Sequence, residues 1–179
     1  MPASEEWPLS LAEWLVLCVV CEQPMHGFAV ARLLGHDGSL GQIWRVPKPV
    51  VYRALQRLEL LALVAAAGEQ ASSQGPVRTL VDVTPAGREA ASAWLTRPVS
   101  HTREVRSELL AKLALLHRAG ADPQPLLEAQ REQLKPIAAA LHDQLAATSG
   151  FDRTLVLWRY ETVTATLRFL DAVRLQGAG

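Results

Sequence analysis

The sequence has few of the residues that mark a secreted, membrane-spanning or metal-binding protein. Only two of its 179 residues are cysteine, so neither a disulfide framework nor a cysteine-rich zinc site is expected. The formal net charge is zero, which excludes a surface that is positive throughout. No basic start precedes the first apolar stretch, and the apolar run over residues 11–21 is too short to cross a bilayer. These absences predict a cytoplasmic protein that does not span a membrane.

Motifs of catalysis and cofactor binding are also absent from the sequence. The five histidines are scattered, and no H-E-x-x-H motif, phosphate-binding glycine loop or serine nucleophile motif occurs. Cys18 and Cys21 form a C-x-x-C pair late in an apolar stretch, where buried reduced thiols are expected and a redox role is the alternative. We therefore expect no enzyme activity, no cofactor and no metal site.

The first part of the chain shows helix signals. Ser10 and Glu13 form a capping box ahead of an apolar helix over about residues 11–21. A second short helix follows and ends at Gly35, and residues 35–42 form a glycine-rich loop.

Residues 46–60, VPKPVVYRALQRLEL, have the pattern of an amphipathic helix with prolines at its start. One face is apolar, and four basic residues occur between positions 45 and 57 without an acid before Glu59. Arginine and lysine bind phosphates, arginine and glutamine can contact base edges, and a tyrosine hydroxyl can donate to a phosphate. The pattern predicts a DNA-contacting helix, with a plain solvated helix face as the alternative. The predicted contact residues are Arg45, Lys48, Tyr52, Arg53, Gln56 and Arg57.

After residue 61 the pattern changes from helix to β-hairpin. Two runs of strand-forming residues flank a polar loop with a glycine, and Thr84 with Pro85 begins another helix that ends near Leu95. The order helix, helix, helix, hairpin, helix is that of a winged helix-turn-helix domain. We expect a mainly α fold with a small β-hairpin wing, divided into a DNA-binding domain over residues 1–98 and a helical dimerisation domain over residues 99–179.

The last predicted helix has an apolar surface too wide for one short domain to cover. A second subunit would bury it, and a two-fold homodimer is the commonest arrangement. One heptad-like seam, predicted to dimerise, contains Val156, Tyr160, Val163, Leu167 and Leu170. A second seam beside it contains Leu155, Trp158, Ala165, Phe169 and Val173.

Three blocks of the sequence together resemble the PadR-type transcriptional regulators. They are LSLAEWLVLCVVCEQPMHGFAVARLL, VVYRALQRLELLALV and TPAGREAASAWL. The resemblance implies a winged-helix repressor of the long form with a helical, dimerising C-terminal region. It places the third helix in the DNA major groove and the wing on the backbone or minor groove, with a small aromatic or hydrophobic effector. Pro49 and Val50 depart from the small or hydroxylated residues usual there, and Ala62 replaces the usual glycine.

Four further residues are candidates for the two binding functions. Arg78, after the wing tip, and His26, at the start of the second helix, are candidates for DNA contact; the alternatives are an exposed strand residue and a helix cap. Trp14 and Trp158 are candidates for effector contact, with packing as the alternative. The sequence thus predicts a homodimeric repressor of duplex DNA that a small molecule releases, or alternatively a winged-helix interaction module that has lost strong DNA binding.

Overall fold

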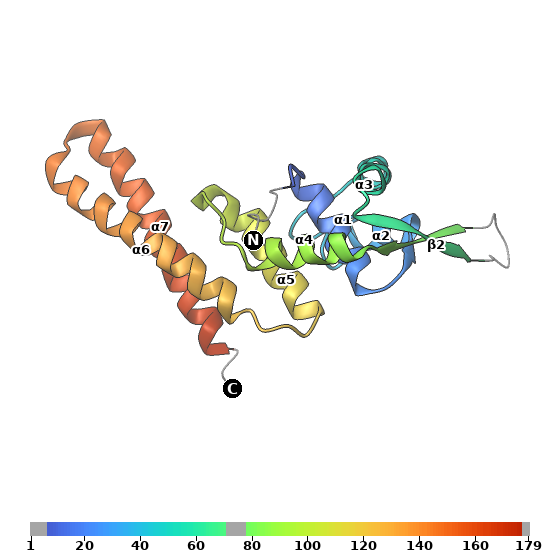
Figure 1. Cartoon of the computed structure of the whole chain (residues 1–179). Helices are drawn as coiled ribbons and strands as arrows, with labels where there is room; N and C mark the ends of the chain where they lie inside the picture. The colour runs from blue at the N-terminus through green and yellow to red at the C-terminus, as the bar shows by residue number, and fades with distance from the viewer. Residues whose placement is uncertain (1–6, 71–77, 177–179) are drawn as a thin grey trace. The chain divides into compact units, whose positions relative to one another are not determined.

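The computed structural model describes residues 7–70 and 78–176, in which helices predominate (Figure 1). The chain divides into two compact units. Unit 1 comprises the described residues up to 95 together with 110–120, and unit 2 comprises residues 96–109 with those from 121 onward. The predicted boundary after residue 98 lies near the first crossing between the units, but the chain returns to unit 1 for one more helix. The assignment of one function to each domain remains a prediction.

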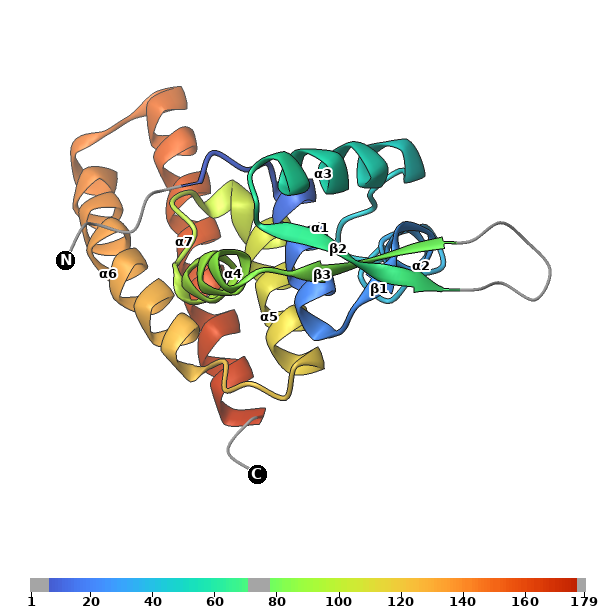
Figure 2. The ribbon, with the colours of Figure 1, turned by 45° about the vertical axis from the view of Figure 1, so that its right-hand side comes forward.

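Unit 1 is a winged helix-turn-helix with one additional helix. Its elements are α1 (Leu11–Glu22), β1 (Met25–His26), α2 (Gly27–Leu33), α3 (Lys48–Leu60), β2 (Val64–Gln70), β3 (Arg78–Val83), α4 (Pro85–Thr96) and α5 (Leu110–Arg118). The three strands form an antiparallel sheet in the order β1-β3-β2. Figure 2 shows α3 above the hairpin of β2 and β3 in that view. The mainly α fold with a small wing is confirmed, and the two-residue strand β1 was not predicted.

Helix α1 forms the centre of this unit, because seven consecutive residues, 14 to 20, are buried. Its start is the predicted capping box: the Ser10 side chain accepts from the Glu13 backbone, and the Glu13 carboxylate accepts from the Ser10 backbone N–H at 2.6 Å. Complete burial of an aliphatic side chain contributes about 1.5–3 kcal/mol. The apolar character of α1 on all sides is therefore a consequence of its central position.

The turn between α3 and β2 determines where the wing begins. Ala62 has a φ of 55°, its N–H donates to Glu59 O, and the Leu63 N–H donates to Leu58 O at 2.9 Å. These two bonds are those of a Schellman motif, in which glycine is usual at the position that Ala62 occupies. Thr84 Oγ1 donates to Ala62 O at 2.7 Å and accepts from the Gly87 N–H at 3.1 Å, so the start of α4 is joined to this turn.

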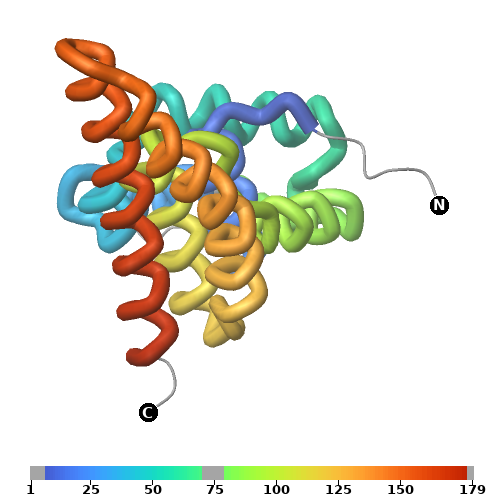
Figure 3. Tube along the Cα trace, turned by 90° about the vertical axis from the view of Figure 1, so that its left-hand side faces the viewer, coloured from blue at the N-terminus to red at the C-terminus, as the bar shows by residue number. Residues whose placement is uncertain are grey.

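Unit 2 is built on a pair of antiparallel helices. Its elements are the 3-10 helix η1 (Thr102–Glu104), the π-helix η2 (Val105–Leu109), α6 (Gln124–Ala147) and α7 (Gly150–Gln176). Figure 3 shows α6 and α7 as the orange and red helices that run in opposite directions. Arg131 of α6 forms an ion pair with Asp171 of α7 at 3.0 Å. The fully buried Gln130 accepts from the Val99 N–H and donates to its carbonyl, which attaches the start of the unit to α6.

No helix in the described part of the chain is long and apolar enough to cross a membrane.

Candidate nucleic-acid interface

Helix α3 is divided into a buried and an exposed face. Val51 and Leu58 are completely buried and Leu55 nearly so, which fixes the underside of the helix on the core. Prolines at its start explain why it begins at Lys48: Pro47 is the N-cap in an extended conformation, and Pro49 lies in the first turn, where its missing N–H costs no hydrogen bond. The side chains exposed on the other side belong to Lys48, Tyr52, Arg53, Gln56 and Arg57.

Arg45 is exposed just before α3, on a loop that the core holds in place. The next residue, Val46, is buried, and its N–H donates to Leu34 O at 2.9 Å. The backbone of this segment therefore returns to the end of α2 before α3 begins. Arg45 and the exposed residues of α3 are thereby brought together as predicted, although their contact with DNA remains a prediction.

The first turn of α3 contacts the start of α2 through three side chains. Lys48 Nζ lies 5.3 Å from the centre of the Phe28 ring and 6.0 Å from that of Tyr52. Gly27 allows the two helices to approach, because a Cβ at this position would lie 3.0 Å from Tyr52 Cε1. We call Phe28, Lys48 and Tyr52 the aromatic-lysine cluster. Phe28 was not among the predicted site residues, because its proximity to α3 depends on how the two helices pack.

His26 caps α2, which was the alternative role considered for it. Its Nδ1 accepts from the Ala29 N–H at 3.0 Å, and its backbone pairs with Leu80 of β3. A neutral imidazole that accepts at Nδ1 carries its proton on Nε2. His26 thus connects the sheet with the start of α2, and its contact with DNA remains a prediction.

Arg57 differs from the other basic residues of α3 because it is paired with an acid of the same chain. Its Nε lies 3.1 Å from Glu13 Oε1, and its Nη2 donates to Pro8 O at 3.3 Å. About half of the Arg57 side chain remains exposed. The capping role of Glu13 was visible in the sequence, but its second partner was not, because 44 positions separate the two residues. Arg57 therefore joins α3 to the start of α1 in the DNA-free protein.

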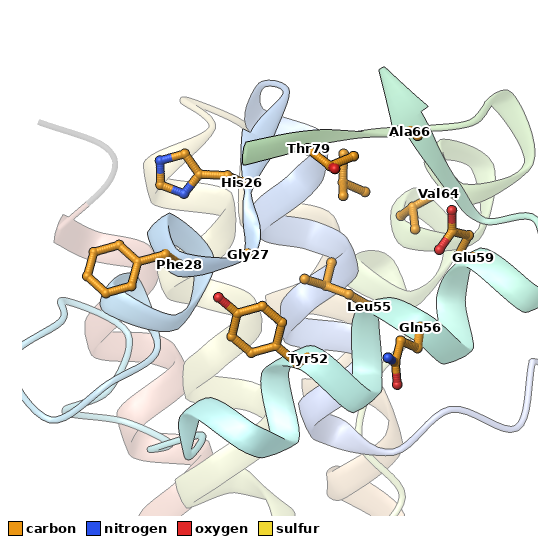
Figure 4. Close-up of a pocket in the computed structure, with 11 residues that line it drawn as sticks. His26, Gly27, Phe28, Tyr52, Leu55, Gln56, Glu59, Val64, Ala66 and Thr79 are labelled. Carbon is orange, nitrogen blue, oxygen red and sulfur yellow. The ribbon is translucent and has the colours of Figure 1, made fainter. Parts of the chain in front are cut away.

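A cleft of about 650 Å³ lies between α2, α3 and the sheet (Figure 4). Its apolar lining on α3 and the strands comes from Leu55, Val64, Ala66 and Val81. Tyr52 and Gln56 also line it from α3. Glu59 adds a carboxylate near the end of the same helix, so the cleft as a whole is not positively charged. It separates the exposed face of α3 from the wing.

The wing itself is described only in part. Strands β2 and β3 pair from Val64 with Val83 up to Gln70 with Arg78, with an irregularity between Ala66 and Gly68. Arg78 begins β3, but its side chain lies outside the described residues, as does the tip at residues 71–77. The predicted backbone contact of Arg78 therefore remains a prediction.

Both cysteines are free thiols in an environment that keeps them protonated. Cys18 is buried and Cys21 is half-buried. Burial raises the pKa of the Cys18 thiol well above its usual value and raises the pKa of Cys21 to about 11. Within the described ranges no group of three or more histidine, cysteine or acidic side chains could hold a metal ion. This arrangement is that of structural thiols and not of an activated nucleophile.

The two tryptophans predicted to contact an effector lie in different environments. Trp14 is buried and stacks on Trp94, with ring centres 5.3 Å apart and an angle of 6° between the planes. Lys112 Nζ of α5 lies 4.6 Å from the centre of the Trp94 ring, so Trp14 belongs to a packed layer in the core of unit 1. Trp158, in contrast, is 70% exposed on α7. The packing alternative therefore describes Trp14, while the role of Trp158 remains open.

The seam predicted to dimerise lies within the chain's own helix pair. Val156, Val163 and Leu170 are buried, and the Tyr160 ring lies 5.6 Å from that of His142 on α6. Leu167 is half-buried. These residues pack against α6 of the same chain. This corrects the expectation that the seam is free to bind a partner subunit. The large apolar side chains exposed on α7 are Phe151, Leu155, Leu157, Trp158 and Leu175.

Comparison with known proteins finds a family match in the N-terminal part of the chain. Residues 16–93 match the model of the transcriptional regulator PadR-like family, and this range lies within unit 1. No curated protein matches the sequence.

Several solved structures align with most of the chain at low sequence identity. PadR of Bacillus subtilis in complex with operator DNA shares 16% identity at a TM-score of 0.48, with 92% of this chain and 97% of that chain covered. The same protein in complex with p-coumaric acid gives 16% identity, a TM-score of 0.42 and coverages of 94% and 96%. A PadR-like transcriptional regulator of Bacillus cereus gives 15% identity, a TM-score of 0.40 and coverages of 90% and 98%.

Proposed function

We propose that this chain, whose residues 16–93 match the model of the PadR-like family of transcriptional regulators, is a repressor that binds duplex DNA as a homodimer and is released by a small-molecule effector. One observation supports DNA binding above all: the exposed face of α3 presents Lys48, Arg53 and Gln56 on a helix whose opposite face is fixed in the core. The third helix of such a domain enters the major groove, where lysine and arginine contact phosphates and glutamine reads base edges.

The proposed dimer uses the exposed apolar side chains of α7. Phe151 is 76% exposed and Trp158 is 70% exposed, and large apolar groups clustered on a surface mark an interaction site. A two-fold axis would bring two copies of this surface together, so that the apolar surface of one subunit packs against the same surface of the other. Two α3 helices would then bind half-sites about 34 Å apart, one turn of the duplex.

Release by an effector requires that the ligand prefer one arrangement of the dimer. A small aromatic or hydrophobic molecule that binds the DNA-incompetent arrangement more tightly shifts the population toward it. Trp158 is the residue we propose for effector contact, since its ring lies on the α7 surface proposed to form the dimer, where a bound ligand changes the arrangement of the two subunits, whereas Trp14 is packed in the core.

Titration of a fluorescent duplex from the region upstream of the protein's own coding sequence tests DNA binding. We expect saturable binding, tighter than to a scrambled duplex of equal length, with an affinity that falls linearly in log–log form as salt rises. Replacement of Arg53 by Gln should weaken binding to both duplexes. Equal affinity for the two duplexes would exclude sequence-specific regulation by this chain.

A second function, an interaction module without strong DNA binding, is favoured by one observation. Arg57 is held by Glu13 and Pro8, which leaves Arg45, Lys48 and Arg53 as the remaining basic side chains of this segment. Absence of binding to any duplex at low salt would support this alternative, because few phosphate contacts mean weak electrostatic affinity.

A further inference from the structure

The first turn of α3 holds a lysine between two aromatic rings that come from two different helices. Lys48 Nζ lies within 6.0 Å of the centres of both the Phe28 and Tyr52 rings, and all three side chains are exposed. A lysine at the surface normally samples many rotamers, which costs free energy when the ammonium group must be fixed on a ligand. Aromatic faces attract an ammonium group and restrict where it lies.

The proximity of the rings is built into the fold. Gly27 leaves no side chain between the start of α2 and Tyr52, and the His26 cap fixes the backbone that leads into Phe28. Tyr52 and Lys48 are four residues apart on one helix, where side chains are neighbours. The cluster thus depends on the packing of both helices.

Arg53 and Arg57 have no such arrangement with aromatic rings among the described residues. Arg57 is directed by Glu13 instead. Within the part of the chain that the structure describes, Lys48 is thus the basic residue of α3 that has aromatic rings beside its ammonium group, and these uncharged rings leave its charge available to an anion.

We infer that Phe28 is a positioning residue for DNA binding: its ring holds the Lys48 ammonium group in place for a backbone phosphate of the duplex. The inference rests on the proposed DNA binding and extends it to a residue on α2. Lys48 makes the phosphate contact. Phe28 restricts the Lys48 side chain beforehand, so that less conformational entropy is lost when the contact forms.

Nuclear magnetic resonance tests the cluster in the DNA-free protein. The chain has three lysines, Lys48, Lys112 and Lys135, so selective labelling gives three ε-methylene signals. We expect the Lys48 signal to be shifted upfield by the rings and to move toward the position of the exposed Lys135 signal in Phe28→Leu. An unchanged Lys48 signal in this variant would overturn the inference.

A double-mutant cycle on DNA affinity tests the consequence. Phe28→Leu should weaken binding about two- to fivefold, which is the cation–π interaction expressed as affinity, without a change in the salt slope. Lys48→Ala should reduce the slope by about 0.9, and in this background Phe28→Leu should have no further effect. Phe28→Tyr, which keeps an aromatic ring beside Lys48, is the matched control and should bind DNA like the wild type.

The outcomes separate the inference from the proposed function. Suppose that wild-type protein binds DNA, but Phe28→Leu changes the DNA affinity equally in the wild-type and Lys48→Ala backgrounds, or in neither. Phe28 then does not act through Lys48, and the inference fails while the proposed function stands. If wild-type protein binds no duplex at low salt, both fail together.

Discussion

The Nε atom of Arg57 lies 3.1 Å from Oε1 of Glu13, whose other oxygen accepts from the Ser10 backbone N–H. One carboxylate therefore caps α1 and anchors α3. The Glu13 side chain is only 13% exposed, so its partners are better shielded from salt than those of an ordinary surface ion pair. Two arginines four residues apart on α3 therefore differ in their surroundings: Arg57 is paired with Glu13, and Arg53 is exposed.

Replacement of each arginine by glutamine should show this difference. Arg57→Gln should lower the free energy of unfolding by about 0.5–1 kcal/mol and leave the salt slope of DNA binding nearly unchanged. Arg53→Gln should leave stability unchanged and reduce the slope by about 0.9. Urea unfolding and salt-dependent anisotropy measure the two quantities. Equal loss of slope in both variants would mean that Arg57 leaves Glu13 to bind phosphate.

Ala62→Gly should stabilise the protein. Ala62 has a φ of 55°, a conformation that costs an L-residue about 1 kcal/mol and costs glycine little, although glycine loses more entropy on folding. We expect a gain of about 0.5–1 kcal/mol in the free energy of unfolding by urea denaturation. Ala65→Gly, at an exposed strand position of β2, is the matched control and should destabilise. A loss of stability in Ala62→Gly would contradict the left-handed conformation of Ala62 in the turn between α3 and β2.

Trp158→Ser should weaken the dimer without unfolding the subunit, since its side chain is mostly exposed in the single chain. Sedimentation velocity should show a dissociation constant raised by at least tenfold, as expected for loss of an aromatic anchor of about 2 kcal/mol. Arg159→Ser, one position along the same helix, is the control. Val163→Ser should instead unfold the α6–α7 pair, because Val163 is buried within the subunit. A dimer unaffected by Trp158→Ser would place the interface elsewhere.

The thiols should react slowly with a thiol reagent in the native protein at neutral pH, because burial raises both pKa values and the thiolate is the reactive form. Unfolded protein loses the Cys21 proton near its ordinary pKa of 9.0, while the native protein keeps it up to about 11. The stability contributed by this thiol is thus present below pH 9 and falls as pH rises from 9 toward 11. The urea midpoint of the wild type should therefore be lower at pH 10 than at pH 7.5. This difference should be smaller in Cys21→Ser, which lacks the thiol.

Local signals predicted most of the fold, because they need only neighbours in sequence. The Ser10–Glu13 capping box, the prolines before α3 and the Thr84 cap each occur within four residues, and each helix begins where they indicate. The strand β1 could not be predicted, since two residues give no period. Helical periodicity predicted two apolar seams on α7. It did not predict which seam α6 covers, because both seams have the spacing needed to pack against a neighbouring helix.

The sequence predicted which residues of the candidate site are exposed, but not which side chains they contact. Exposed residues on α3 followed from the helical period, whereas the pairing of Arg57 with Glu13 and of Lys48 with Phe28 depends on how distant segments pack. Pairings of this kind depend on the tertiary structure, which the local sequence pattern does not contain.

Photo-crosslinking from α3 tests the central claim most directly. A benzophenone amino acid at position 56, in place of Gln56, should crosslink to the upstream duplex, while the same group in place of Glu89, exposed on α4 of the same unit, should not. Efficient crosslinking from position 56 alone is the predicted result. Crosslinking from position 89 and none from position 56, under conditions where the duplex is bound, would show that α3 is not the helix that contacts DNA.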